Sequence, residues 1–234
     1  MLRILVLVAF IFFLNCEDKQ SQPKEQNAKP IKSIKKSPNK IDSSEIKTPE
    51  FPFLTDENAM EFFLEYEKEN PENKIRITTR FGKIDILLYD KIKFHRANFI
   101  YLTKRGYFDG TQFYRVIDNF IIQAGNTDDP KIKRKRGDIG RYLLPPDTKR
   151  GFKHHRGVVS MPSSEIEDAY KLASPFEFFI VQNKDGAYHL DGDYTIFGEV
   201  ISGMDVVDEI AAQKTDDGDW PLRNVYIKKV EIIK

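Results

Sequence analysis

The sequence predicts a mainly β domain, folded as a closed antiparallel barrel with helices over its ends. Three observations support this fold class. Short runs of alternating apolar residues recur from about residue 74 onward, as half-buried strands require. Only two or three stretches space their apolar residues as a helix does. Strands and helices do not alternate regularly, which disfavours a doubly wound parallel sheet.

The folded part is expected to begin with a short helix. Thr55 has the character of an N-cap and is followed by two acidic residues in the first turn. Phe62, Phe63 and Tyr66 then give an apolar face that fades before Pro71.

Eight strands are expected, each from its alternation of apolar and polar positions. They cover residues 74–80, 83–89, 113–117, 121–125, 157–161, 177–182, 195–200 and 225–233. The last strand changes phase, since Val225 and Ile227 are odd-numbered and Val230 and Ile232 even-numbered. One extra residue near Lys228-Lys229, a bulge, would keep all four side chains inward.

Two further helices are expected among these strands. One covers about residues 95–105, with basic residues in its last turn and Gly106 as its end. The other starts at Ser202, with Asp205 three residues later as in a capping box. An apolar stripe at 206, 207 and 210 gives it one buried face.

The first sixteen residues resemble an export signal. Arg3 supplies a positive charge, and eleven apolar residues follow from Ile4 to Leu14. This run is shorter than the 18 to 20 residues of a spanning helix but fits the apolar region of a secretory signal. It ends at Asn15 and Cys16, and resembles a bacterial lipoprotein signal in which the cysteine is lipidated. Asn15 departs from the usual small residue, which leaves an ordinary cleaved signal or an uncleaved anchor as alternatives.

Residues 1–15 are thus expected to be a signal peptide, with Cys16 as the lipid attachment site. Residues 16–50 are expected to be a disordered tether, because 17–50 are mostly polar and hold eight Lys against six acidic residues. Residues 51–234 form the expected folded domain. This organisation predicts a protein of the cell envelope, bound to the membrane by its lipid anchor and facing the periplasm or the cell surface.

Composition excludes several classes of function. With 37 Lys plus Arg and 36 Asp plus Glu, the net charge is +1, which gives no support for a nucleic-acid partner. The single cysteine allows no intrachain disulfide, CxxC redox centre or multi-cysteine zinc site. The four histidines include one adjacent pair, whose side chains diverge on either a strand or a helix, so no metal is expected.

Residues 113–126 predict a hairpin that carries polar groups into an apolar setting. A two-residue loop would place Arg115 and Gln123 on opposite faces. A three-residue loop, 118–120, would place Phe113, Arg115, Ile121 and Gln123 on one face. The alternative interpretation is a core hairpin whose arginine extends its charged end to water.

The sequence of this hairpin resembles the signature of cyclophilins, the peptidyl-prolyl cis–trans isomerases. Three later segments resemble cyclophilin motifs in the family's order: Gly157–Met161, Glu177–Ile180 and Leu190–Gly198. The resemblance covers about residues 74–233. It implies an eight-stranded barrel capped by two helices, an activity that rotates X–Pro bonds in extracytoplasmic proteins and assists their folding, and no cofactor.

The resemblance also implies roles for individual residues. The catalytic set is Arg115, Phe120 and Gln123; Arg115 would donate to the imide nitrogen and Gln123 would hold the substrate backbone. The substrate-binding set is Phe113, Ile121, Ser163, Glu177, Phe179, Leu190 and Tyr194. Proline-containing polypeptides are the expected partners, and we expect a monomer.

Four positions depart from the cyclophilin pattern. Pro162 lacks an N–H, Glu177 replaces Gln, His189 replaces Trp and Tyr194 replaces His. Pro162 and Glu177 keep a second hypothesis open, a cyclophilin-fold module or chaperone that binds proline segments with weak or no turnover.

The run 131–136, with five basic residues of six, is expected in a long loop, either as a solvated surface or as a docking patch for acidic clients or lipid headgroups.

Overall fold

The computed structural model describes residues 51–163 and 170–234. The expected signal peptide, the lipid site at Cys16 and the tether to residue 50 lie outside the described residues. Within the described part, no helix is both long and apolar enough to cross a membrane.

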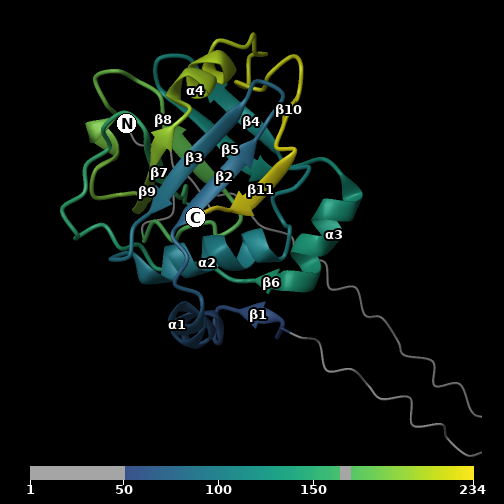
Figure 1. The fold of residues 1–234 in the computed structure, drawn as a ribbon, viewed down its shortest axis with the longest axis vertical. Coiled ribbons are helices and arrows are strands. Elements are labelled where there is room, and N and C mark those ends of the chain that lie inside the picture. Colours follow the sequence, from purple (N-terminus) through teal and green to yellow (C-terminus); the bar gives the residue numbers. More distant parts are fainter. Residues whose placement is uncertain (1–50, 164–169) are drawn as a thin grey trace, which may run out of the picture. The chain divides into compact units, whose positions relative to one another are not determined.

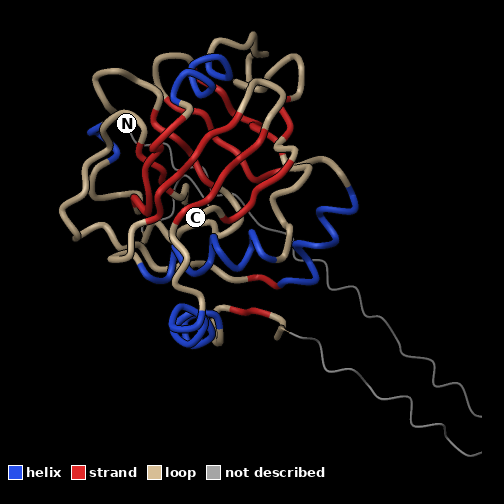
Figure 2. The backbone as a smooth tube through the Cα atoms, in the orientation of Figure 1, coloured by secondary structure: helices blue, strands red, loops and turns tan. Residues whose placement is uncertain are grey.

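A curled antiparallel sheet forms the centre of the domain (Figures 1 and 2). Its strands are β2 (Lys74–Thr78), β3 (Lys83–Leu88), β4 (Gln112–Ile117), β5 (Ile121–Asn126), β7 (Val158–Ser160), β8 (Phe178–Val181), β9 (Ile196–Ser202), β10 (Val225–Tyr226) and β11 (Lys229–Ile232). Their order is β10-β4-β5-β8-β7-β9-β3-β2-β11. A separate parallel pair joins β1 (Leu54–Thr55) to β6 (Gly140–Arg141).

The sheet has nine strands rather than the expected eight, because the last expected strand is divided. β10 pairs with β4 and β11 pairs with β2, so consecutive segments of chain lie at the two ends of the strand order. The break falls at residues 227–228, next to the expected bulge. Val225, Ile227 and Val230 are buried, and Ile232, the fourth side chain expected inward, is partly buried against the core.

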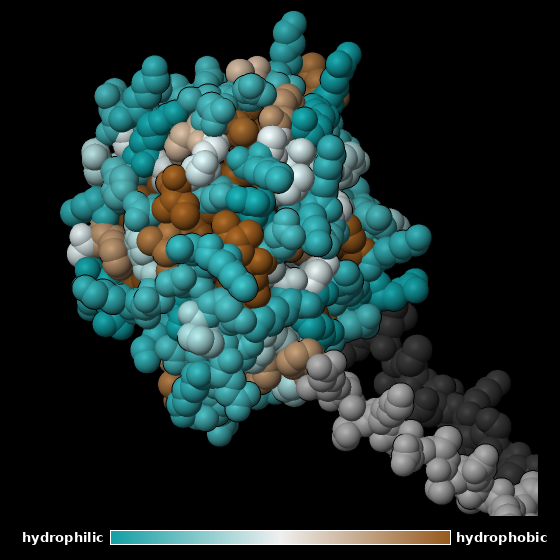
Figure 3. Space-filling model, viewed as in Figure 1, coloured by the Kyte–Doolittle hydropathy of each residue, from teal (hydrophilic) through white to brown (hydrophobic). Residues whose placement is uncertain are grey.

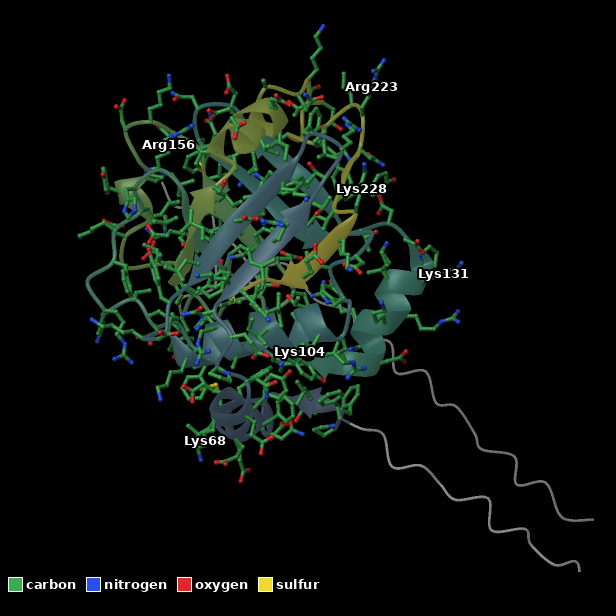
Figure 4. All side chains as sticks on the ribbon, in the orientation of Figure 1. Lys68, Lys104, Lys131, Arg156, Arg223 and Lys228 are labelled. Carbon is green, nitrogen blue, oxygen red and sulfur yellow. The ribbon has the colours of Figure 1, made fainter. Side chains whose placement is uncertain are left out.

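In the part of the chain that the structure describes, four α-helices lie around the sheet: α1 (Ala59–Glu69), α2 (Lys93–Lys104), α3 (Pro130–Ile139) and α4 (Met204–Ala211), with a short 3-10 turn η1 (Tyr188–Leu190). Residues 95–103 of α2 are all buried, and Figure 1 shows α2 between the sheet and α1. At the opposite end of the sheet α4 buries its apolar stripe. Its Asp208 accepts from Arg156, labelled in Figure 4, at 2.6 Å.

Two expected helix starts are corrected by the structure. The N-cap of α1 is Asn58 rather than Thr55, whose backbone N–H instead donates to the Asn58 side chain at 2.8 Å. Ser202 is the last residue of β9, and Gly203 takes the cap position of α4. In both cases the polar residue that suggested a cap belongs to the preceding turn or strand.

The basic run lies on a helix, α3, where a loop was expected. Asp129 caps α3 by accepting from the N–H of residue 131 at 2.8 Å, and Pro130 occupies its first position. The exposed basic residues are Lys131, Lys133 and Arg134, the first labelled in Figure 4. Lys135 donates to the carbonyl of Gly106 at 2.9 Å, and Arg136 turns toward the sheet.

The outer surface is mainly hydrophilic on the face seen in Figure 3, with apolar side chains gathered in small areas over the sheet. Aromatic side chains fill the interior. Tyr101, Tyr107, Phe99, Phe108 and Phe178 are each 1% exposed or less. This packing gives β4, β5 and β8 a rigid base.

Candidate functional site

A cavity of about 420 Å³ opens beside β4, β5 and β8. Its walls combine apolar side chains with one guanidinium and one carboxamide. The lining residues are Arg115, Phe120, Ile121, Gln123, Pro162, Ser163, Phe179, Leu190 and Tyr194. Eight of these were assigned to catalysis or substrate binding from the sequence, and the ninth is Pro162.

Strand register places the central side chains in one row. Arg115 on β4 is opposite Gln123 on β5, and Gln123 is opposite Phe179 on β8. Phe179 in turn is opposite Ser160 on β7. The β4–β5 loop has three residues, 118–120, which is the loop length that puts Arg115 and Gln123 on one face. Asn119 takes the left-handed conformation that this short loop needs, with φ 55°.

Phe113 does not reach the cavity, so its expected place in the substrate-binding set is wrong. The register shifts between Phe113, which pairs with Ala124, and Arg115. This bulge inserts Tyr114 as an extra residue and reverses the alternation of faces. Phe113 is fully buried in the core, edge-on to Phe178 at 6.3 Å between ring centroids.

Glu177 also lies outside the cavity wall, contrary to the expectation. Its carboxylate Oε2 accepts from the hydroxyl of Tyr114 at 3.0 Å, and Oε1 lies 3.8 Å from the guanidinium of Arg136. The Tyr114 oxygen accepts from the carboxamide nitrogen of Gln123. Glu177 therefore lies behind Gln123, because the bulge turns Tyr114 into the space between them. Burial raises the pKa of Glu177, against the effects of Tyr114 and Arg136.

Arg115 has a contact that sequence reasoning missed. Its Nε lies 3.4 Å from Oδ2 of Asp219, and the guanidinium side chain is 42% exposed. The carbonyl of Asp219 also accepts from the N–H of Val116 at 2.9 Å. No spacing in the sequence links positions 115 and 219, so no local signal could have found this pair.

Aromatic contacts stiffen the far walls of the cavity. The ring of Phe120 stacks on His189 with centroids 5.4 Å apart. Phe179 meets Tyr194 edge-on at 5.8 Å. Leu190 ends the turn η1 and so closes the apolar side of the cavity.

A buried hydrogen-bonded triplet supports this wall from behind. Nδ1 of His154 lies 2.8 Å from Oδ1 of Asp191, and Nε2 lies 3.0 Å from Oγ of Ser160. Burial lowers the pKa of His154 by more than the bond to Asp191 raises it. His154 and Ser160 are fully buried, so the serine is no accessible nucleophile. The His154 ring stacks on Phe179 with centroids 6.1 Å apart, and Asp191 follows Leu190 in the chain, so the triplet lies directly behind this wall.

Comparison with known proteins decides the family. The family model described as "Cyclophilin type peptidyl-prolyl cis-trans isomerase/CLD" matches residues 74–232. The chain belongs to the cyclophilin-type peptidyl-prolyl cis–trans isomerase family. The resemblance noted in the four sequence motifs is thus confirmed.

Several cyclophilins share this domain. The isomerase CYP18-1 of Arabidopsis thaliana is 35% identical over 68% of this chain and 94% of its own length. An isomerase of Acinetobacter baylyi is 34% identical over 58% of this chain and 71% of its own. The isomerase-like 2 protein of Rhizopus delemar is 35% identical over 71% of this chain, but the match spans only 30% of that longer protein.

Solved structures agree with the fold. A crystal structure of a Cryptosporidium parvum cyclophilin superposes with a TM-score of 0.57 and 26% identity, covering 70% of this chain and 98% of that one. That protein has also been crystallised in the presence of the dipeptide Ala-Pro. The mainly β fold with a curled antiparallel sheet is therefore the cyclophilin fold.

The cavity places a permanently charged side chain among apolar walls. Arg115 presents a fixed, permanently charged donor, and the rings beside it provide an apolar surface. Among the described residues, no group of three or more His, Cys, Asp or Glu side chains could hold a metal ion.

Proposed function

We propose that this cavity binds a proline-containing segment and catalyses rotation about its X–Pro bond. The observation that supports this proposal most directly is the row formed by Arg115, Gln123 and Phe179 across three neighbouring strands. It sets a cation, a carboxamide and an aromatic ring side by side on a rigid sheet. Phe120, Ile121, Phe179 and Leu190 would take the proline ring, as in other cyclophilins.

The chemistry is electrostatic. Rotation breaks amide resonance against a barrier of about 18–20 kcal/mol, and the imide nitrogen gains a lone pair as conjugation is lost. Arg115 would donate to that nitrogen and so stabilise the twisted state more than either planar state. Gln123 and the main chain at Ser163 would hold the substrate backbone while the bond turns, with Tyr194 against the segment.

Kinetics on short X–Pro peptides test this proposal. Arg115→Ala is expected to lower kcat/KM by about 10²–10³, because one preorganised donor is lost. Arg115→Lys should have a kcat/KM only slightly above that of Arg115→Ala, since a compact ammonium lacks the planar fork of N–H donors. Circular dichroism of both variants controls for folding. Wild-type turnover in Arg115→Ala would overturn the role of Arg115.

A second candidate function is proline-peptide binding without useful turnover. Pro162 favours it, because it lines the cavity and has no N–H to offer a peptide. In that case the wild-type protein would bind the peptides, seen as shifted amide resonances, while their cis–trans exchange rate stayed at the uncatalysed value.

We propose further that the protein works in the cell envelope, anchored through a lipid on Cys16 and held away from the membrane by residues 17–50. The apolar run 4–14, ending at the only cysteine of the chain, supports this. Cys16→Ser should move the protein from the membrane to the soluble fraction and abolish labelling by a radioactive fatty acid. Retention of both properties would contradict the anchor. We expect a monomer, which light scattering of the soluble domain can check.

We also infer that the curled sheet closes into a barrel. The support lies in residues 225–232, whose first part pairs with β4 and second part with β2. Between them, Ile227 donates to Thr111 and Lys228 donates to Thr78, each backbone bond being 2.8 Å.

A further inference from the structure

Tyr114 connects the cavity to two charged residues that do not line it. Its hydroxyl oxygen accepts from the nitrogen Nε2 of Gln123, and its proton goes to Oε2 of Glu177 at 3.0 Å. A hydroxyl has a single proton. The direction of one bond therefore fixes the direction of the other.

The identity of Glu177 sets that direction. An ionised carboxylate can only accept hydrogen bonds, so the Tyr114 proton must point to Glu177. The Tyr114 oxygen is then left as an acceptor, and only the NH₂ end of Gln123 can meet it. A carboxamide with its nitrogen on Tyr114 presents its oxygen on the other side, where Gln123 lines the cavity.

Helix α3 supplies a countercharge beside Glu177. The guanidinium of Arg136 lies 3.8 Å from Oε1 of Glu177 and 4.6 Å from the ring centroid of Phe176. Burial raises the pKa of Glu177, whereas Tyr114 and Arg136 lower it. The other titratable neighbour is Tyr107, whose hydroxyl donates to the carbonyl of Gly125 at 2.9 Å.

We propose that Glu177, acting through the hydroxyl of Tyr114, orients the carboxamide of Gln123 with its oxygen toward the cavity, so that the site accepts a hydrogen bond from a main-chain N–H of the proline-containing segment. Tyr114 and Glu177 are thus positioning residues, and Arg136 favours the charged form of Glu177 that fixes the direction. This inference rests on the proposed function. It adds a rule of substrate choice, namely that the segment must carry an N–H at one defined position near its proline.

A double-mutant cycle tests the positioning role. Tyr114→Phe should lower kcat/KM about fivefold, mainly through KM, because a net hydrogen bond to bound substrate is worth about 1 kcal/mol. In the Gln123→Ala background the same change should have no further effect, since there is no carboxamide to orient. Tyr142→Phe is the matched control, because it removes a buried hydroxyl that donates to Asn98 at 2.7 Å. An equal loss from Tyr114→Phe in both backgrounds would overturn the proposal.

Ester analogues test the direction of the carboxamide. In a capped Ala-Ala-Pro-Ala peptide, each N–H is replaced in turn by an ester oxygen, and affinity is measured by titration of amide resonances. The wild type should lose about tenfold in affinity at one position only. Glu177→Gln should reduce this loss, because a glutamine can donate to Tyr114, which lets the Gln123 carboxamide turn its nitrogen to the cavity.

The outcomes separate this inference from the proposed function. Equal affinity of the wild type for all the esters, or an unchanged loss in Glu177→Gln, would overturn the orientation of Gln123 whether or not the enzyme turns over. An absence of wild-type turnover would overturn the proposed catalysis, while the ester series would still measure the orientation through binding.

Discussion

Nε of Arg115 lies 3.4 Å from Oδ2 of Asp219, which belongs to the loop between α4 and β10. The backbone carbonyl of Asp219 accepts a hydrogen bond from the N–H of Val116, so the loop runs beside the end of β4. Asp219 takes the left-handed conformation, with φ 64°. The loop thus holds a carboxylate against the side of the guanidinium, which leaves the terminal nitrogens free of this contact.

Asp219→Ala is expected to weaken catalysis by freeing the guanidinium. Both side chains are about two-fifths exposed, so the pair itself stabilises the fold little. We expect a three- to tenfold fall in kcat/KM, about 1 kcal/mol, with little change in melting temperature. Asp219→Asn retains the loop conformation and one acceptor and should recover part of the rate. A wild-type rate in Asp219→Ala would show that Arg115 is positioned by the strand alone.

Glu177→Gln should stabilise the protein at neutral pH. Burial raises the pKa of Glu177 above its ordinary value of 4.5, so the folded state prefers the protonated form. The resulting stability is present below pH 4.5 and is lost as the pH rises through the folded pKa. The variant cannot ionise, so its melting temperature should exceed that of the wild type at pH 7 and approach it at pH 4. Equal melting temperatures at both pH values would contradict this. The same variant is expected to lose the fixed orientation of the Gln123 carboxamide. Glu177 would thus lower the stability of the fold while it orients Gln123.

The strands and the core of the site could be predicted because their signals are local. Alternation of apolar residues located all eight expected strands, and the cyclophilin signature of the hairpin assigned Arg115 and Gln123 to the site, although the sequence left open whether the loop has the length that puts them on one face. The misplaced residues depend on the bulge at Tyr114, which reverses a face without changing the apolar pattern. A bulge of this kind is decided by packing between strands, and Phe113 fits the core as well as it would fit a pocket.

The sequence did not predict helix α3 or the contact of Asp219 with Arg115, for two different reasons. Within α3 only Ile132 and Ile139 are buried, too few for a helical stripe, and the remaining signal was the Asp129-Pro130 start. Asp219 reaches Arg115 across 104 positions, a distance at which no pattern operates. Helix α3 could be predicted if capping residues were given more weight than apolar periodicity. The contact between Arg115 and Asp219 can be found only from the three-dimensional structure.

Gly125→Ala should strongly destabilise the domain. Gly125 has φ +104°, and an added Cβ would lie 2.2 Å from the carbonyl oxygen of Phe176. Backbone atoms cannot shift without a large cost in free energy, so β5 and the segment before β8 would have to move apart. Gly137→Ala is the matched control: it meets nothing within 4 Å on α3 and should stabilise by up to about 1 kcal/mol. Unfolding in urea compares the two, and similar midpoints for both variants would contradict the close approach at Gly125.

His95 is expected to make the fold sensitive to acid. It is 1% exposed on α2, neither ring nitrogen has a partner among the described residues, and burial lowers its pKa to about 4. The unfolded chain takes up a proton near pH 6.5 and the folded chain only near 4, so stability is full above pH 6.5 and is lost as the pH falls between these values. At 1.36 kcal/mol for each pH unit, the loss from pH 7.5 to pH 5 is about 2 kcal/mol.

His95→Gln should remove this loss, whatever its effect on stability at pH 7.5. The test is urea unfolding of both proteins at pH 7.5 and pH 5, with the change in unfolding free energy taken for each. Other groups titrate in the same range, but they are common to both proteins and cancel in the difference. Equal losses of unfolding free energy in the wild type and the variant would contradict this prediction. They would mean that His95 takes up a proton as readily in the folded chain as in the unfolded chain.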